Sequence, residues 1–170
     1  MVIGEHGAGE KYTVMMRGDI AFIDTNVLLA ATDEGRGVHV PAVSVFSELT
    51  AGGIHPALSG QVIREYLVVA TRPVEKNGLG LGLDDALGNI AEFRSICIFL
   101  EENAEVAGTL VELLLSSGVY GKRIHDMNIA ATMLSHGVDS LITFNPGDFS
   151  GIDGIRILIP GDFELPHTDS

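Results

Sequence analysis

Residues 20–26 read Ile20-Ala21-Phe22-Ile23-Asp24-Thr25-Asn26, which is an apolar run followed by an acid and a helix-capping residue. The apolar run has the length of a short buried strand. We expect Thr25 to cap a helix over residues 26–31, because a threonine hydroxyl can accept a hydrogen bond from a free N–H at a helix start. A strand that leads through an acid into a helix is typical of the first unit of an α/β fold.

Strands and helices alternate along the rest of the chain. Apolar residues at helical spacing predict helices over residues 39–51, 59–71, 84–93, 104–115 and 124–135. Short apolar runs predict strands over residues 54–58, 96–100, 140–143 and 155–159. Residues 78–82 are expected to form a flexible connection, and Asp84 or Asp85 is expected to cap the helix that follows. The alternation predicts a parallel sheet covered on both faces, a three-layer α/β/α sandwich.

The length of 170 residues predicts one domain with a substantial core. Residues 1–18 lack sustained periodicity, so we expect a flexible extension there, a folded domain over 19–163 and a tail over 164–170. No apolar run approaches the roughly 20 residues that span a bilayer, and no signal sequence is recognisable. A cytoplasmic setting is therefore expected. The single cysteine, Cys97, lies in an apolar run and is expected to be buried in the core.

The net charge of the chain is −13, from 23 acidic and 10 basic residues. Phosphate backbones are bound through Lys and Arg, so this charge opposes an extended, non-specific nucleic-acid binder. It is compatible with an enzyme whose metal ions supply the local positive field. It is also compatible with a basic partner protein.

Four acidic residues lie at the edges of separate apolar segments: Asp24, Glu65, Asp126 and Asp148. Charges that interrupt core-forming segments cost free energy to desolvate unless something compensates them. Ligands of open parallel sheets bind beyond the carboxyl ends of the strands, where Asp24 and Asp148 are expected. A divalent cation held by converging carboxylates would compensate the charges and supply chemistry. We therefore predict a Mg²⁺- or Mn²⁺-dependent enzyme.

Each of these acids also has an ordinary structural explanation. Asp24 can cap the helix that follows it, and Glu65 can be an exposed helix residue. Asp126 can be a first-turn acid stabilised by the helix dipole. Asp148 ends Asn145-Pro146-Gly147-Asp148, which is typical of a turn. The coincidence of all these positions in one chain favours the metal site.

Four stretches of the chain resemble the motifs of the PIN-domain family, in particular the VapC-like toxin ribonucleases. They occur in the family's order and spacing, within residues 20–160: Phe22-Ile23-Asp24-Thr25-Asn26-Val27-Leu28, Ser59-Gly60-Gln61-Val62-Ile63-Arg64-Glu65-Tyr66-Leu67, His125-Asp126-Met127-Asn128-Ile129-Ala130-Ala131-Thr132 and Leu141-Ile142-Thr143-Phe144-Asn145-Pro146-Gly147-Asp148-Phe149. The resemblance implies a five-stranded parallel sheet of order 3-2-1-4-5 and metal-dependent cleavage of phosphodiester bonds. Asp24, Glu65 and Asp126 match the invariant acids of the family.

The resemblance and the residue types together imply a role for each acid. Asp24 and Asp126 would bind the cation, because Mg²⁺ prefers oxygen ligands and keeps several waters. Glu65 would bind the cation through water or position the attacking water. Family members often have an aspartate at the position of Asn145, so either Asn145 or Asp148 takes the fourth place.

Three further side chains lie close to these acids in the sequence. Thr143 and Asn26 are expected to support the metal ligands through hydrogen bonds. His125 is expected to be structural, since no second His or Cys stands at the spacing of a zinc site.

The leading functional hypothesis is an endonuclease of single-stranded RNA, the toxin of a type II toxin–antitoxin pair with a basic antitoxin. A HAD-like phosphatase also begins with an aspartate at a strand end, but it needs a second acid where Asn26 stands. A PIN-like RNA-binding or scaffold module with an inactive site is the third alternative. The resemblance also suggests a homodimer, with the apolar faces of residues 39–51 and 59–71 as contact surfaces.

Overall fold

A five-stranded parallel sheet lies at the centre of the computed structural model, which describes residues 12–13 and 18–164. Its strands are β2 (Ile20–Ile23), β3 (His55–Ser59), β4 (Ile98–Leu100), β5 (Ser140–Ile142) and β6 (Arg156–Leu158). Their order is β4-β3-β2-β5-β6, and every neighbouring pair is parallel. The predicted α/β class and the strand order 3-2-1-4-5 are confirmed.

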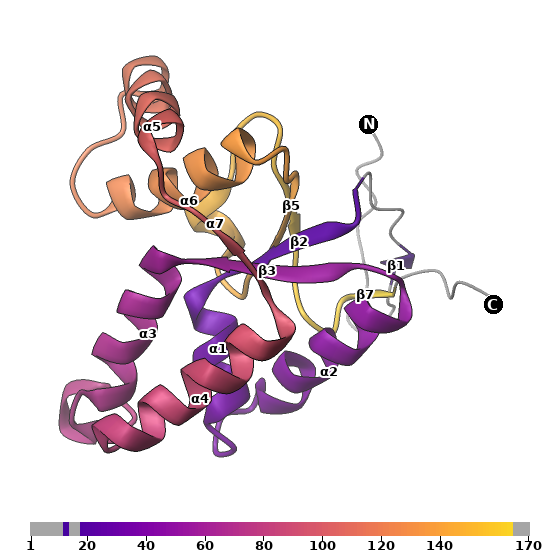
Figure 1. Cartoon of the computed structure of the whole chain (residues 1–170), viewed down its shortest axis with the longest axis vertical. Coiled ribbons are helices and arrows are strands. Elements are labelled where there is room, and N and C mark those ends of the chain that lie inside the picture. The colour runs from indigo at the N-terminus through magenta and orange to yellow at the C-terminus, as the bar shows by residue number, and fades with distance from the viewer. Residues whose placement is uncertain (1–11, 14–17, 165–170) are drawn as a thin grey trace.

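Helices cover the sheet on both sides (Figure 1). On one side lie α1 (Thr25–Thr32), α2 (His39–Ala51), α3 (Gly60–Thr71) and α4 (Leu83–Ile96). On the other side lie α5 (Ala104–Ser117), α6 (Arg123–Ser135) and the short α7 (Pro146–Phe149). The largest side chains of the core between these layers are fully buried, among them Phe22, Tyr66, Leu141 and Ile142.

Helix starts are where the structure departs most from the predictions. Asp24, not Thr25, caps α1, because the Asp24 side chain accepts a hydrogen bond from the Thr25 N–H. Helix α4 starts after Gly82, so Asp84 and Asp85 lie in its first turn and neither is its cap. Both acids still suit that place, where the helix dipole favours negative charge.

The connection after α3 is a hydrogen-bonded loop rather than a free linker. It contains the 3₁₀ helix η1 (Val74–Lys76), and the N–H of Gly80 donates to the Arg72 carbonyl at 2.8 Å. The N–H of Leu81 donates to the Ala70 carbonyl at 2.9 Å. These bonds fold residues 78–81 back onto the last turn of α3.

A second, two-stranded pair joins distant parts of the chain. Strand β1 (Tyr12–Thr13) pairs in parallel with β7 (Phe163–Glu164), and Phe163 is fully buried. The sequence did not predict this pair. Most of the expected extension over residues 1–18, and nearly all of the tail over 164–170, lie outside the described residues, so those domain boundaries stay predictions.

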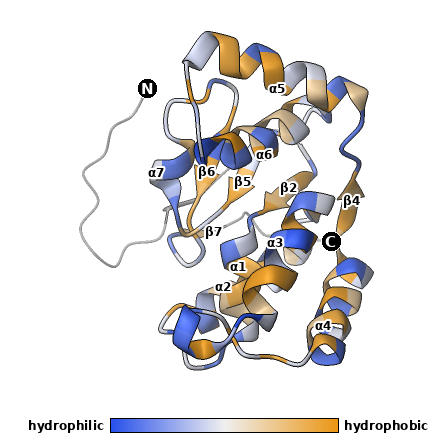
Figure 2. Cartoon of the chain, turned by 90° about the vertical axis from the view of Figure 1, so that its left-hand side faces the viewer, coloured by the Kyte–Doolittle hydropathy of each residue, from blue (hydrophilic) through white to orange (hydrophobic). Residues whose placement is uncertain are grey.

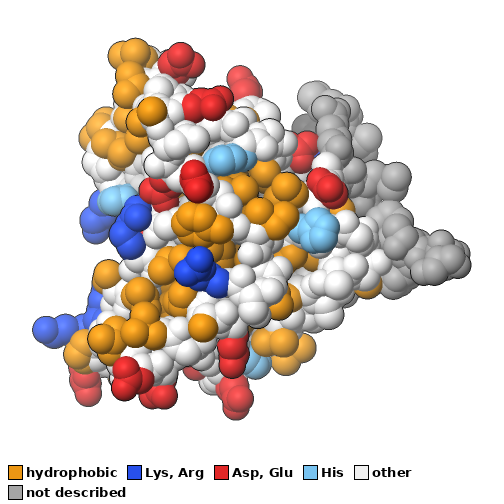
Figure 3. All heavy atoms as spheres, in the orientation of Figure 1, with side chains coloured by type: hydrophobic (Ala, Val, Ile, Leu, Met, Phe, Trp, Pro, Cys, Tyr) orange, Lys and Arg blue, Asp and Glu red, His pale blue; other side chains and the backbone are white. Residues whose placement is uncertain are grey.

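Several apolar side chains lie on the surface of the sandwich. Helix α5 packs mainly on α6 and buries only Val106 fully, whereas Val111 and Leu115 are exposed. In Figure 2, β4 is largely orange, and α4 and α5 carry orange segments among white and blue ones. Figure 3 shows apolar side chains gathered in the centre of one face. Within the described part of the chain, no helix has both the length and the apolarity to cross a membrane.

Cys97 lies between α4 and β4 and is half-buried against the core, not fully buried as predicted. Burial raises the pKa of its thiol to about 12. The thiol is therefore protonated at neutral pH.

Candidate active site

Asp24 lies between the end of β2 and the start of α1, and its side chain is 7% exposed. One carboxylate oxygen accepts from the Thr25 N–H at 2.7 Å. The other accepts from Asn26 Nδ2 and from the Thr143 hydroxyl, each at 2.7 Å. These donors fix the Asp24 carboxylate in one orientation at the carboxyl end of the sheet.

Asn26 and Thr143 join α1 to the segment that follows β5. Asn26 Nδ2 also donates to Thr143 Oγ1 at 2.9 Å, and its Oδ1 accepts from the Phe144 N–H at 3.0 Å. The Asn145 N–H donates to Thr143 Oγ1 at 3.0 Å. Both side chains therefore hold the Asp24 carboxylate through hydrogen bonds. Their support of a metal ligand stays a prediction.

Glu65 lies in the middle of α3 and faces the same edge of the sheet. Its Oε2 accepts from the Thr25 hydroxyl at 2.9 Å, and its Oε1 accepts from Gln61 Nε2 at 2.7 Å. Thr25 thus contacts two of the acids, since its N–H donates to Asp24 and its hydroxyl donates to Glu65.

Asp126 lies in the first turn of α6 and completes the group of acids. Burial, followed by the negative charges of Asp148 and Glu65, raises its pKa to about 6, although Arg123 and His125 oppose the rise. Burial likewise raises the pKa of Asp24 to about 6, against its hydrogen bonds and with the charges of Glu65 and Asp126 adding to the rise. The carboxylates therefore lie close enough to repel one another.

The fourth motif contributes two exposed side chains from α7 and its start. Asp148 lies in the first turn of α7 and acts electrostatically on Asp126. Asn145 stands at the N-cap position of α7, and its side chain makes no capping hydrogen bond. Electrostatic interactions thus link Asp24 with Glu65 and Asp126, and Asp126 with Glu65 and Asp148. Asn145 reaches this group only through its N–H, which bonds Thr143.

The donor set fits a hydrated hard cation. Among the described residues, no group of three or more His, Cys, Asp and Glu side chains is placed so that it could hold a metal ion. An open set of carboxylate oxygens is nevertheless what Mg²⁺ uses, because this ion keeps several of its waters and takes only one or two carboxylates directly. Such a cation would neutralise the negative charges of these acids and so relieve their mutual repulsion.

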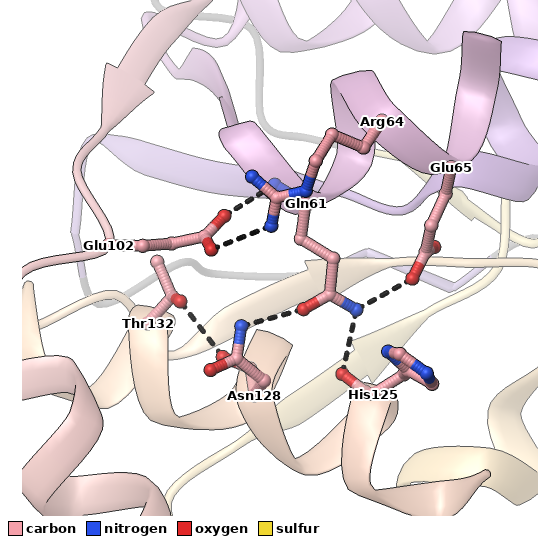
Figure 4. Close-up of polar contacts among 7 residues, drawn as sticks. All are labelled: Gln61, Arg64, Glu65, Glu102, His125, Asn128 and Thr132. Atoms are coloured by element: carbon pink, nitrogen blue, oxygen red, sulfur yellow. Dashed lines mark hydrogen bonds and ion pairs between the residues drawn. The ribbon is translucent and has the colours of Figure 1, made fainter. Parts of the chain in front are cut away.

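A second network behind Glu65 was not predicted from the sequence. The Gln61 amide contacts Glu65, the His125 carbonyl and Asn128, and Glu102 contacts the start of α3 (Figure 4). A partial signal was present, since Gln61 stands one helical turn before Glu65 and faces the same side. The contact with Asn128 depends on how α3 and α6 are placed, which no local pattern specifies.

A cleft of about 600 Å³ opens beside this network, between α3 and α6. Its lining includes Glu65, Gln61, Val68, Arg72 and Ile124. The candidate site is therefore continuous with a groove of mixed apolar and cationic character.

Comparisons with known proteins agree with this fold. A PIN domain model matches residues 21–155. Comparison with curated proteins finds no match. Among solved structures, the VapBC2 complex from Rickettsia felis, bound to a promoter DNA fragment, matches at 18% identity and a TM-score of 0.60, over 82% of this chain and 98% of that chain.

Two further solved structures share the fold. Mycobacterium tuberculosis VapC20, a toxin that cleaves the sarcin–ricin loop, matches at 20% identity and a TM-score of 0.61, over 80% of this chain and 98% of that chain. A toxin–antitoxin complex from Klebsiella pneumoniae matches at 23% identity and a TM-score of 0.58, over 84% of this chain and 98% of that chain. At these identities the likeness shows the fold.

Proposed function

Because the chain belongs to the PIN-domain family, we propose that it is a Mg²⁺- or Mn²⁺-dependent endoribonuclease that cleaves single-stranded RNA. One observation carries this proposal. Burial and mutual repulsion raise the pKa of Asp24 and of Asp126 to about 6, and the charge of Glu65 acts on both. Such perturbed acids are typical of functional sites.

The residues would divide the work as follows. Asp24 and Asp126 would hold the cation, which supplies Lewis-acid activation of water and neutralises charge at the phosphate when bound. Glu65, whose carboxylate is oriented by Thr25 and Gln61, would position the attacking water and accept its proton. Asp148 or Asn145 would complete the rim of the site.

We further propose that the chain is a toxin that acts in the cytoplasm and is inhibited by a basic antitoxin. The similar solved structures from Rickettsia felis and Klebsiella pneumoniae are toxin–antitoxin assemblies. The net charge of −13 favours a basic partner. A homodimer is proposed as well, with exposed Val40 and Val43 of α2 and Val68 of α3 on its contact surfaces, to be checked by sedimentation.

The test is cleavage of a labelled single-stranded RNA by purified protein. We expect activity with Mn²⁺ or Mg²⁺, loss with EDTA, and recovery when the cation is added back. Asp24→Asn and Asp126→Asn should each abolish cleavage while the circular dichroism spectrum is retained. Asp84→Asn is the matched control, because it removes an exposed acid in the first turn of α4. RNA binding without cleavage in the wild-type protein would instead identify an inactive RNA-binding module.

A further inference from the structure

Gln61 uses its whole amide to join α3 to α6. Its Nε2 donates to Glu65 Oε1 at 2.7 Å and to the His125 carbonyl at 2.9 Å, and its Oε1 accepts from Asn128 Nδ2 at 2.7 Å (Figure 4). The side chain is 4% exposed, so these bonds are shielded from water. A buried amide with both donors and its acceptor engaged is costly to disturb.

The partners of Gln61 permit only one orientation of its amide. A carboxylate and a backbone carbonyl can only accept hydrogen bonds, so both must face the nitrogen of Gln61. Asn128 must then turn its own NH₂ group toward the remaining oxygen. A glutamate at position 61 would have the same size, but its carboxylate would face two other acceptors, the Glu65 carboxylate and the His125 carbonyl.

The α3 end of this bridge is itself held in place. The Gln61 N–H donates to the Glu102 carboxylate, which also pairs with Arg64 at 3.0 Å. Burial opposes ionisation of Glu102, but hydrogen bonds from Arg64 and Gln61 outweigh it and keep the pKa of Glu102 below its ordinary value. Gly60 allows the approach, because a Cβ there would stand 3.3 Å from the Glu102 carboxylate.

The bridge stands where α3 and α6 are otherwise separated by the cleft beside the site. Glu65 is one turn after Gln61 on α3, and Asp126 is two residues before Asn128 on α6. The separation of the two helices therefore sets the separation of these two carboxylates. The hydrogen bond between Gln61 and Asn128 joins the two helices and so fixes that separation.

We propose that Gln61 is a positioning residue which, through Asn128 and the His125 carbonyl, fixes Glu65 of α3 relative to Asp126, the proposed cation-binding acid of α6. This inference rests on the proposed metal-dependent function of the same site. Groups that orient metal ligands commonly change metal affinity about 10- to 100-fold when they are replaced.

The experiment measures Mn²⁺ affinity directly, by electron paramagnetic resonance of free Mn²⁺ and by the shift of the melting temperature with Mn²⁺ concentration. Gln61→Met keeps the size of the side chain and removes its hydrogen bonds, whereas Asn128→Leu removes the tie from the other helix and leaves the Gln61–Glu65 bond. Each variant should bind Mn²⁺ about 10- to 100-fold more weakly. The double variant should bind no more weakly than the weaker single variant, because both changes break one bridge.

Ser135→Ala is the matched control. It removes a side-chain bond of 2.9 Å between α6 and α5, at the end of α6 away from Asp126, and should leave Mn²⁺ affinity unchanged. Melting in EDTA checks that each variant is folded. If Gln61→Met does not fold, the Mn²⁺ affinity of Asn128→Leu alone tests the positioning role.

Two results would overturn the inference, and they separate it from the proposed function. Wild-type affinity in the variants, or additive losses in the double variant, contradicts the positioning role while the metal site stands. A wild-type protein that binds no Mn²⁺ contradicts the proposed function and the positioning role together.

Discussion

The Asp24 carboxyl accepts three hydrogen bonds, which would ordinarily lower its pKa, yet its pKa is raised to about 6. Burial outweighs the bonds, and the charges of Glu65 and Asp126 add to it. A rise from 3.8 to about 6 makes the ionised, folded state less stable by about 3 kcal/mol than an unperturbed acid would. The metal-free fold therefore carries a local cost that a cation would relieve.

The first prediction is a pH dependence of the metal-free protein. Since the folded pKa of Asp24 lies above its unfolded value, the folded state holds the extra proton between these values, and stability falls as pH rises through that window. From about pH 5 to about pH 7, Asp24 alone should lower the free energy of unfolding by about 1 kcal/mol. Urea unfolding in EDTA measures this, and the decline should be smaller in Asp24→Asn. An equal decline in both proteins contradicts the assignment.

The second prediction decides between the two side chains of the fourth motif. Asp148 already acts on Asp126 through space, whereas the Asn145 side chain makes no capping bond. Asp148→Asn should therefore reduce Mn²⁺-dependent cleavage about tenfold, and Asn145→Ala should reduce it less. Steady-state rates at several Mn²⁺ concentrations make the comparison. The opposite ranking would give the fourth place to Asn145.

At the scale of elements, local patterns predict some boundaries and miss others for physical reasons. Helix α2 runs over residues 39–51 as predicted, because its apolar spacing is regular and Gly52-Gly53 ends it. The pair β1–β7 has two residues in each strand, so its stability depends on contacts across the chain rather than on a local pattern.

Some residues of the candidate site could likewise be found from local sequence patterns and others could not. The acids could be recognised as candidates, because each charge interrupts an apolar segment. Gln61 was not, since its role depends on Asn128 and on the placement of α6 against α3. The cap of α1 was misassigned because Asp24 and Thr25 are both capping residues, and only the backbone geometry separates them.

The third prediction concerns the loop that closes on α3. A Cβ at Gly78 would stand 2.0 Å from the Arg72 carbonyl oxygen, and that atom belongs to the backbone and cannot turn away. Gly78→Ala should lower the free energy of unfolding by about 2–4 kcal/mol, as measured by urea denaturation. Gly88→Ala is the control, because it lies inside α4 with nothing within 4 Å, and should stabilise the protein by about 0.5–1 kcal/mol. Equal effects of the two changes would contradict the close approach.

For the whole molecule, the fourth prediction concerns inhibition. An arginine can engage a carboxylate through two parallel hydrogen bonds, so the acid cluster at Asp24, Glu65 and Asp126 suits an arginine of a basic antitoxin segment. A peptide of that kind should inhibit cleavage, and the same peptide with its Arg and Lys changed to Ala should not. Inhibition constants for the two peptides provide the measurement. Equal inhibition by both would exclude a charge-based mechanism.

The single thiol of the chain makes the protein a convenient host for site-directed labels. Cys97 is the only cysteine, and its raised pKa leaves almost no thiolate at neutral pH to react with maleimide or methanethiosulfonate reagents. A cysteine introduced at exposed Ser116, near the end of α5, would therefore carry a spin label with little background from the native residue. Pulsed dipolar spectroscopy on that one position would report a distance between chains wherever two copies associate, without any removal of the native cysteine.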